Sequence, residues 1–234
     1  MKRIVLALAT LAVAHAAFAT VIFDSITPAT ALRNTGSTPR NHMADVVSTT
    51  APINAAWSWV VNSIDTGFVA IANRTYNNLT LRVRVWGNVD VNNPTNIFSN
   101  SLSDVTWNLG SPALAGPAAF GATLNYSANN VAFNIGNGQN IGIDYLFMEN
   151  GQATNDLTML LCDSTPNPGS SSNGFWRDAN GNGVFDTTEA RVFTGIPNAN
   201  IYARINAQAV PEPTTMALAG AGLVALLRKR AKKA

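Results

Sequence analysis

Cysteine and histidine are scarce in this 234-residue chain, which has one cysteine, Cys162, and two histidines, His15 and His42. A single cysteine excludes a disulfide within the chain. Cys162 follows the apolar run 157–161, and we expect a buried strand thiol, because free cysteine usually packs as a small core residue. A catalytic cysteine needs a histidine partner, and only His42 lies beyond the first 19 residues. The sequence therefore argues against thiol catalysis.

Lysine is missing from residues 20–210, which contain eight arginines and twelve acidic residues, a formal charge of −4. The whole chain is nevertheless +2, because basic residues concentrate at its two ends. Nucleic-acid binding needs lysine and arginine clustered on the folded part. The eight arginines are scattered along the sequence, so we expect no nucleic-acid partner.

Enzyme signatures are missing too, including Gly-x-Ser-x-Gly, a phosphate-binding loop and a histidine-rich metal motif. A glycoside hydrolase needs two carboxylates that face each other. Asp144, Glu149, Asp156 and Asp163 are close in sequence, but we expect them to be solvated charges of turns and edge strands. We predict no catalytic residues and no enzymatic activity, with a glycoside hydrolase as a less favoured alternative.

Long helical periodicity is absent between residues 20 and 207, where short apolar or alternating segments recur between polar turns. In the clearest segment, 79–86, apolar residues occupy every second position, which is typical of a half-buried strand. Such segments predict an all-β fold, an antiparallel β-sandwich or jelly roll. The expected strands are 21–26, 56–61, 68–72, 79–86, 104–109, 131–135, 141–148, 157–161, 191–194 and 201–206, with the Pro/Gly/Ser-rich segment 166–174 as a loop.

Residues 1–19 have the pattern of a secretory signal peptide. A basic start precedes an apolar stretch and the small residues Ala17 and Ala19, which suit a signal peptidase at positions −3 and −1. We predict export and cleavage after Ala19. The alternative is a permanent N-terminal anchor.

Residues 208–234 contain three elements in order: the tripeptide Pro211-Glu212-Pro213, the apolar segment 214–227 and the basic tail 228–234. A helix over 214–227 would span roughly 21 Å, against a hydrocarbon core of ~30 Å. It would be a short transmembrane helix, suited to a transient anchor. The basic tail is expected to stay cytoplasmic.

This C-terminus resembles the PEP-CTERM sorting signal. The resemblance implies an exported bacterial protein with Pro211, Glu212 and Pro213 as the recognised tripeptide. It also implies processing at the membrane by an exosortase, a cysteine-type transpeptidase, and then a cell-surface or extracellular location. The body, residues 20–207, resembles jelly-roll-like domains found with such signals. The alternative is a plain tail anchor after a proline-rich linker.

Residues 178–189 follow the pattern of an EF-hand calcium loop. Oxygen-bearing side chains occupy positions 1, 3, 5, 9 and 12, namely Asp178, Asn180, Asn182, Asp186 and Glu189. Gly183 stands where the loop turns sharply, Val184 would offer its carbonyl oxygen, and Phe185 would attach the loop to a core. The preceding residues do not predict a helix, so we expect an EF-type loop between two strands, with Ca²⁺ in a structural role. The alternative is an Asn-Gly-rich hairpin.

Arg82, Arg84 and Trp86 share the second face of segment 79–86. An aromatic ring beside polar donors can pack against a sugar ring, so this face is a possible glycan contact. The alternative is an ordinary strand surface. An ice-binding protein would need a regular array of threonine, and the sequence has no Thr-x-Thr ladder.

Together these features predict an exported, PEP-CTERM-sorted protein, a non-enzymatic component of an exopolysaccharide or biofilm matrix. The main alternative is a calcium-stabilised carbohydrate-binding module.

Overall fold

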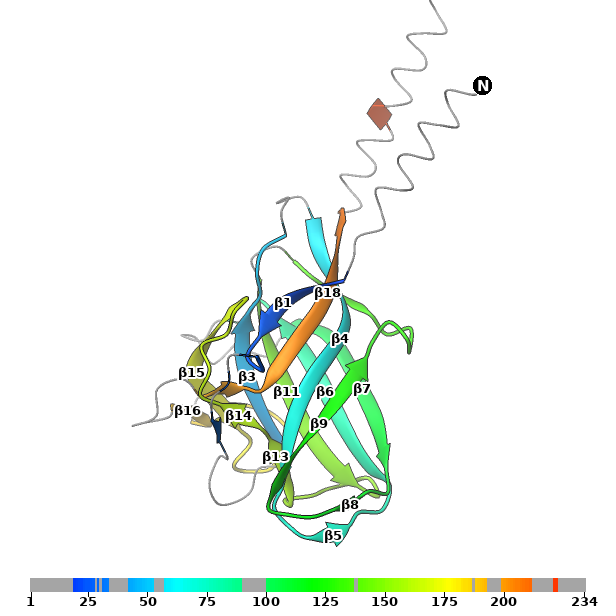
Figure 1. The fold of residues 1–234 in the computed structure, drawn as a ribbon, viewed down its shortest axis with the longest axis vertical. Coiled ribbons are helices and arrows are strands. Elements are labelled where there is room, and N and C mark those ends of the chain that lie inside the picture. The colour runs from blue at the N-terminus through cyan, green and yellow to red at the C-terminus, as the bar shows by residue number, and fades with distance from the viewer. Residues whose placement is uncertain are drawn as a thin grey trace, which may run out of the picture.

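The computed structural model describes residues 19–27, 29, 31–33, 42–52, 57–89, 100–136, 139–186, 188–192, 199–211 and 221–222. Two antiparallel sheets pack face to face in this part of the chain (Figure 1), which confirms the predicted β-sandwich. The strands are β1 (Thr20–Asp24), β2 (Leu32–Arg33), β3 (His42–Ser48), β4 (Trp57–Ala70), β5 (Arg74–Thr75), β6 (Leu79–Gly87), β7 (Asn100–Gly110), β8 (Ala113–Leu114), β9 (Ala118–Asn125), β10 (Phe133–Ile135), β11 (Asn140–Glu149), β12 (Gln152–Ala153), β13 (Leu157–Met159), β14 (Leu161–Cys162), β15 (Ser170–Arg177), β16 (Ala190–Val192), β17 (Asn200–Ile201) and β18 (Ala203–Pro211).

The first sheet is built around β4. One edge of β4 pairs with β18 and β13 and the other with β9 and β10, while β1 adds to β18. The sequence predicted two strands here, 56–61 and 68–72, and this is wrong. Residues 62–67 are mostly polar, yet they continue the strand because β18 and β9 pair with residues 63–66 from both sides, with Ile64 in the core and Asp65 partly exposed.

The second sheet has the order β16-β15-β3-β11-β6-β7, with β12 beside β11. Strand β6 shows the predicted alternation, because Leu79, Leu81, Val83 and Val85 are buried and the residues between them are partly exposed. The loop expected at 166–174 is wrong for its second half. Strand β15 begins at Ser170 and pairs with β3 across a bulge, a pairing that composition alone could not reveal.

The main core lies between the two sheets and contains large buried side chains such as Phe23, Tyr76, Tyr126, Tyr145 and Phe147. Two small sheets, β17-β14-β2 and β5-β8, lie beside the main ones. Cys162 in β14 is buried, as predicted.

The two ends of the chain fall largely outside the described residues. These include the predicted signal peptide before Ala19, Glu212 and Pro213, and most of the apolar segment 214–227. Among the residues described, no helix is both long and apolar enough to cross a membrane.

Candidate functional site

The segment 178–189 joins β15 to β16, as the sequence predicted. The two strands pair directly, with Trp176 opposite Ala190. The loop closes where the Arg177 amide donates to the Glu189 carbonyl oxygen at 3.3 Å, and the Asp178 amide donates to the carbonyl oxygen of His42 at 3.2 Å. Strand pairing therefore holds the loop at both of its ends.

Phe185 attaches this loop to the outer face of the second sheet. It is 6% exposed and belongs to a second apolar cluster with Ala44, Val46, Val89 and Trp176. Its ring centroid lies 4.4 Å from that of His42. The predicted role of Phe185 as an apolar anchor agrees with this placement.

Asp178 and Glu189, the first and last residues of the loop, accept hydrogen bonds from its backbone. Both are buried, at 5% and 2% exposed. Asp178 accepts from the amides of Gly181, Asn182 and Gly183 at 2.7, 3.1 and 2.8 Å. Glu189 accepts from the amides of Ala179, Asn180 and Asp186 at 2.7, 3.2 and 3.3 Å.

The other predicted oxygen ligands form local turns. The side-chain oxygens of Asn180, Asn182 and Asp186 each accept from the amide two residues later, at 2.9, 2.8 and 2.7 Å. This is the Asx-turn geometry. Gly183 has a φ of 78°, so the sharp turn predicted at this position is present and needs glycine.

The donor set has the chemistry that Ca²⁺ prefers, because every predicted side-chain ligand is a hard oxygen. The carboxylates are turned toward backbone amides, however. Within the described part of the chain, no three or more histidine, cysteine, aspartate or glutamate side chains gather closely enough to hold a metal ion. Calcium binding at residues 178–189 stays a prediction.

A buried polar cluster lies beneath the loop, on the outer face of β3, β11 and β6. His42 and Asp144 are 2% and 0% exposed. The Arg84 Nη2 atom lies 2.6 Å from Asp144 Oδ2 and 2.7 Å from His42 Nε2. Trp86 Nε1 donates to Asp144 Oδ2 at 3.3 Å. The strand register explains the gathering, because Asp144 is the partner of Ala44 on β3 and of Arg84 on β6.

The cluster fixes how His42 meets the loop. The ionised carboxylate of Asp178 can only accept hydrogen bonds, so the His42 Nδ1 atom beside it carries a hydrogen. His42 Nε2 lies 2.7 Å from Arg84 Nη2 and 3.2 Å from Asp144 Oδ1. His42 Nδ1 then donates to Asp178 Oδ2 at 2.9 Å. Burial raises the pKa of Asp178, but the hydrogen bonds from His42 and from the amides of Gly183 and Gly181 outweigh it and lower that pKa.

The residues predicted to contact glycan separate into two environments. Arg84 and Trp86 belong to the buried cluster, with the Arg84 Cζ atom 5.2 Å from the Trp86 ring centroid. Arg82 lies on the exposed side and forms a two-pronged pair with Asp104 at 2.8 and 2.5 Å. Glycan contact at these residues is untested and stays a prediction.

The expectation of solvated carboxylates is wrong for Asp144, which is fully buried. Its charge is paired with Arg84, and Trp86 donates a hydrogen bond to it, so the carboxylate does not need water. Glu149 and Asp156 instead pair with Arg74, each at 2.8 Å, near the β5 turn. Sequence reasoning did not identify His42 or the buried Asp45 as site residues. Both lie in strand β3, whose other residues are apolar except for Ser48. A histidine and an aspartate within such an apolar strand are the one sequence signal that could have indicated them.

A groove lies on the outer face of the first sheet, with a cavity volume of about 320 Å³. Its lining is Ile26, Asp65, Thr66, Gly121, Ala122, Thr123, Tyr202 and Arg204. Gly67 and Gly121 are direct partners across β4 and β9 and contribute no side chains of their own to this surface, and the Tyr202 ring lies close to Gly67. Thr123 donates to Asp65 at 2.8 Å beside it. Polar groups and an aromatic ring therefore surround the hollow.

The strands nearest the two predicted processing signals are neighbours. Strand β1 begins at Thr20, directly after the predicted signal-peptidase site, and Thr20 pairs with Ala207 of β18. Strand β18 continues to Pro211, which pairs with Trp57. The boundary that the sequence placed at 207 therefore falls inside a strand.

Residues 209–231 match the family model described as the PEP-CTERM protein-sorting motif. No curated protein and no solved structure matches the chain. The match confirms the predicted sorting signal. The chain is an exported protein and an exosortase substrate, held transiently in the membrane before it reaches the cell surface or the extracellular space.

Proposed function

We propose that the sandwich is a non-enzymatic component of an extracellular matrix, delivered by its sorting motif and associated with the exopolysaccharide of the producing cell. The observation that supports this is the burial of its most reactive side chains. His42, Asp144 and Asp178 are at most 5% exposed and hydrogen-bond one another or Arg84. Such a cluster stabilises the fold and offers no solvent-facing acid–base pair.

Two experiments test this proposal. Replacement of Pro211, Glu212 and Pro213 by alanine should leave an unprocessed chain of higher mass in the membrane fraction. A strain without the protein should have an altered matrix, measured as the polysaccharide retained by washed cells, and should recover when the wild-type chain is supplied. An unchanged mass would contradict the processing, and an unchanged matrix would contradict the matrix role alone.

We further propose that signal peptidase cuts after Ala19 and that residues 178–189 bind Ca²⁺ in a structural role. The first is supported by the start of β1 at Thr20, because a cut after Ala19 would place the new N-terminus at the first residue of a strand. The second is supported by the oxygen donor set and by the strands on both sides of the loop.

Carbohydrate binding is the second candidate function, and the groove on the first sheet favours it. Its volume of about 320 Å³ is within the usual range for small-ligand sites. Sugar rings pack on aromatic faces while their hydroxyls meet polar groups, and Tyr202 lies beside Asp65, Thr123 and Arg204 there.

Retardation of the purified protein in gels containing the cell's own exopolysaccharide tests this function and its location. Tyr202→Ala should abolish the retardation, and Trp86→Ala should leave it unchanged. The opposite result would place glycan contact on the β6 face that the sequence predicted. No retardation of the wild-type protein would remove carbohydrate binding as a function.

A further inference from the structure

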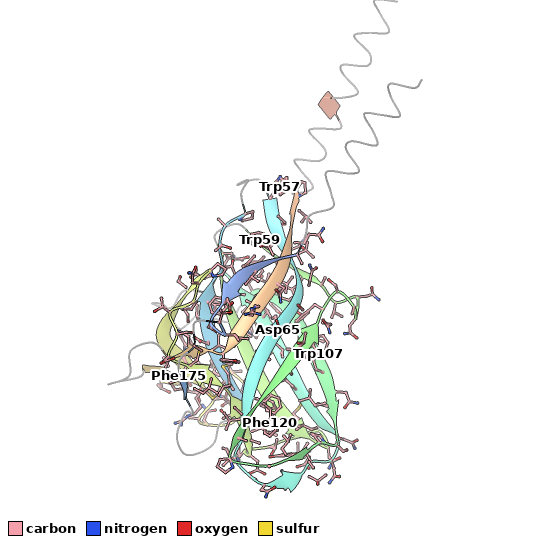
Figure 2. All side chains as sticks on the ribbon, viewed as in Figure 1. Trp57, Trp59, Asp65, Trp107, Phe120 and Phe175 are labelled. Atoms are coloured by element: carbon pink, nitrogen blue, oxygen red, sulfur yellow. The ribbon has the colours of Figure 1, made fainter. Side chains whose placement is uncertain are left out.

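Pro211 has two roles in this chain. It is the first residue of the tripeptide recognised in the sorting signal, and it is the last residue of β18, opposite Trp57 at the start of β4. The matched sorting motif begins at residue 209, so Ala209 and Val210 also lie in both the motif and the strand. Figure 1 shows β18 and β4 side by side at this end of the sandwich, and Figure 2 places Trp57 there.

This overlap creates a conflict between folding and processing. A transpeptidase has to enclose the peptide that it cleaves, and enzymes and receptors that bind extended peptides commonly use the main-chain hydrogen-bonding groups of the peptide. The backbone of residues 209–211 is already paired with Trp59, Ser58 and Trp57 of β4. The start of the motif therefore cannot be enclosed while it remains part of the sheet.

The end of β18 is nonetheless suited to opening. Strand β1 pairs with β18 only between Arg204 and Ala207, so in the described structure the residues beyond Ala207 pair with β4 alone. Pro211 has no N–H and cannot donate to the ladder. Strand ends with few partners open locally at a much lower free-energy cost than global unfolding.

We propose that the pairing of residues 209–211 with β4 controls processing, so that the exosortase acts only on chains in which this strand end has separated from Trp57. The proposal rests on the exosortase processing stated above. The processing rate then depends on the fraction of chains that are open at this end. The sandwich thereby regulates its own release from the membrane.

A disulfide that locks the strand end tests the proposal. Val210 and Ser58 are direct cross-strand partners, and antiparallel partners have Cα separations of about 4.5–5.5 Å, within disulfide range. The double variant Ser58→Cys/Val210→Cys should form the bond after export into an oxidising compartment. In a pulse-chase of the producing cells, we expect conversion of the full-length chain to its processed form to slow by roughly tenfold or more.

Two matched variants isolate the effect. Ser63→Cys/Asn206→Cys joins the same two strands at another direct pair but leaves residues 209–211 able to open, and it should be processed at the wild-type rate. A flexible Gly/Ser insertion between Val210 and Pro211 in the locked variant separates the recognised tripeptide, which begins at Pro211, from the locked part of the strand, and it should restore processing.

Each result decides the question. Wild-type processing of the Ser58→Cys/Val210→Cys chain, with the disulfide verified by mass, would overturn the proposal and leave exosortase processing intact. Equal slowing by both disulfides would also overturn it, because the position of the lock would not matter. If alanines at 211–213 do not block conversion, exosortase processing itself fails, and the proposal fails with it.

Discussion

His42 Nδ1 lies 2.9 Å from Asp178 Oδ2 and donates a hydrogen bond to it. This contact joins the first residue of β3 to the first residue of the loop 178–189, which is 136 positions away in the sequence. Arg84 holds the other ring nitrogen of His42 at 2.7 Å. One imidazole therefore links the second sheet, its buried Asp144–Arg84 pair and the loop.

Removal of this imidazole should destabilise the protein strongly. His42→Ala removes the one side-chain hydrogen bond described for Asp178 and opens a space beside Phe185. Losing one partner of a buried polar network costs about 2–4 kcal/mol. Urea unfolding followed by tryptophan fluorescence measures the change. Arg82→Ala is the control, because its pair with Asp104 is about two-fifths exposed and should be worth less than about 1 kcal/mol. Equal losses in the two variants would contradict a network role for His42.

Calcium should raise the thermal stability of the protein through the loop. If the dissociation constant is about 1 mM, 10 mM Ca²⁺ stabilises the folded state by about 1.4 kcal/mol. Asp186→Asn should remove most of this shift, because it neutralises one of the three carboxylates of the loop. The hydrogen bonds described for the Asp186 side chain are local, from Thr188, so the substitution should disturb the fold little. Differential scanning calorimetry with and without Ca²⁺ measures the shift.

The control for the calcium experiment is Asp104→Asn, which neutralises a carboxylate on β7 outside the loop and should retain the full shift. Magnesium at the same concentration should stabilise less, because it prefers a rigid octahedral site. A wild-type protein that does not respond to Ca²⁺ would leave the Asn-Gly hairpin as the correct interpretation of residues 178–189.

The sequence predicted local features well and long-range gatherings poorly. The alternation in β6 and the apolar anchor Phe185 depend on nearest neighbours along the chain, so pattern alone revealed them. The joining of Arg84 and Trp86 to His42 and Asp178 depends on the register among β3, β11 and β6. The predicted strands 56–61 and 68–72 leave out residues 62–67, because pairing of residues 63–66 from both sides, and not local preference, keeps this stretch extended.

Asp45 should make the protein less stable as the pH rises toward 8. Burial raises the pKa of Asp45 to about 8, although the amides of Ile201 and Val46 act to lower it. A folded-state pKa above the unfolded value means that the stabilisation is complete below about pH 4 and is lost as the pH rises through the folded pKa. Asp45 lowers the free energy of unfolding by at most about 1.4 kcal/mol for each pH unit in this range.

Asp45→Asn should remove this pH dependence, since asparagine stays neutral. The measurement is the difference in unfolding free energy between variant and wild type from pH 5 to 8, which should move in favour of the variant as the pH rises. Asp104→Asn again serves as the control. Hydrogen bonds from Arg82 lower the pKa of Asp104, so its contribution is present above its unfolded pKa and is lost only in more acidic solution. Parallel curves for Asp45→Asn and the wild type would contradict a buried, protonated Asp45.

The paired glycines Gly67 and Gly121 should respond in opposite ways to the same substitution. A Cβ atom on Gly67 would lie 2.6 Å from Leu160 Cδ2 and 2.8 Å from Tyr202 Cδ1, whereas one on Gly121 would meet only the Thr66 carbonyl oxygen, at 3.8 Å. Gly67→Ala should therefore cost about 1–3 kcal/mol, because it forces Leu160 and the Tyr202 ring to move. Gly121→Ala should be neutral or stabilising by up to about 1 kcal/mol, through a less flexible unfolded chain. Both glycines lie in strands and face each other, so their different surroundings alone should separate their urea midpoints. Equal midpoints would mean that Tyr202 does not lie across Gly67, and the aromatic wall of the groove would then be misplaced.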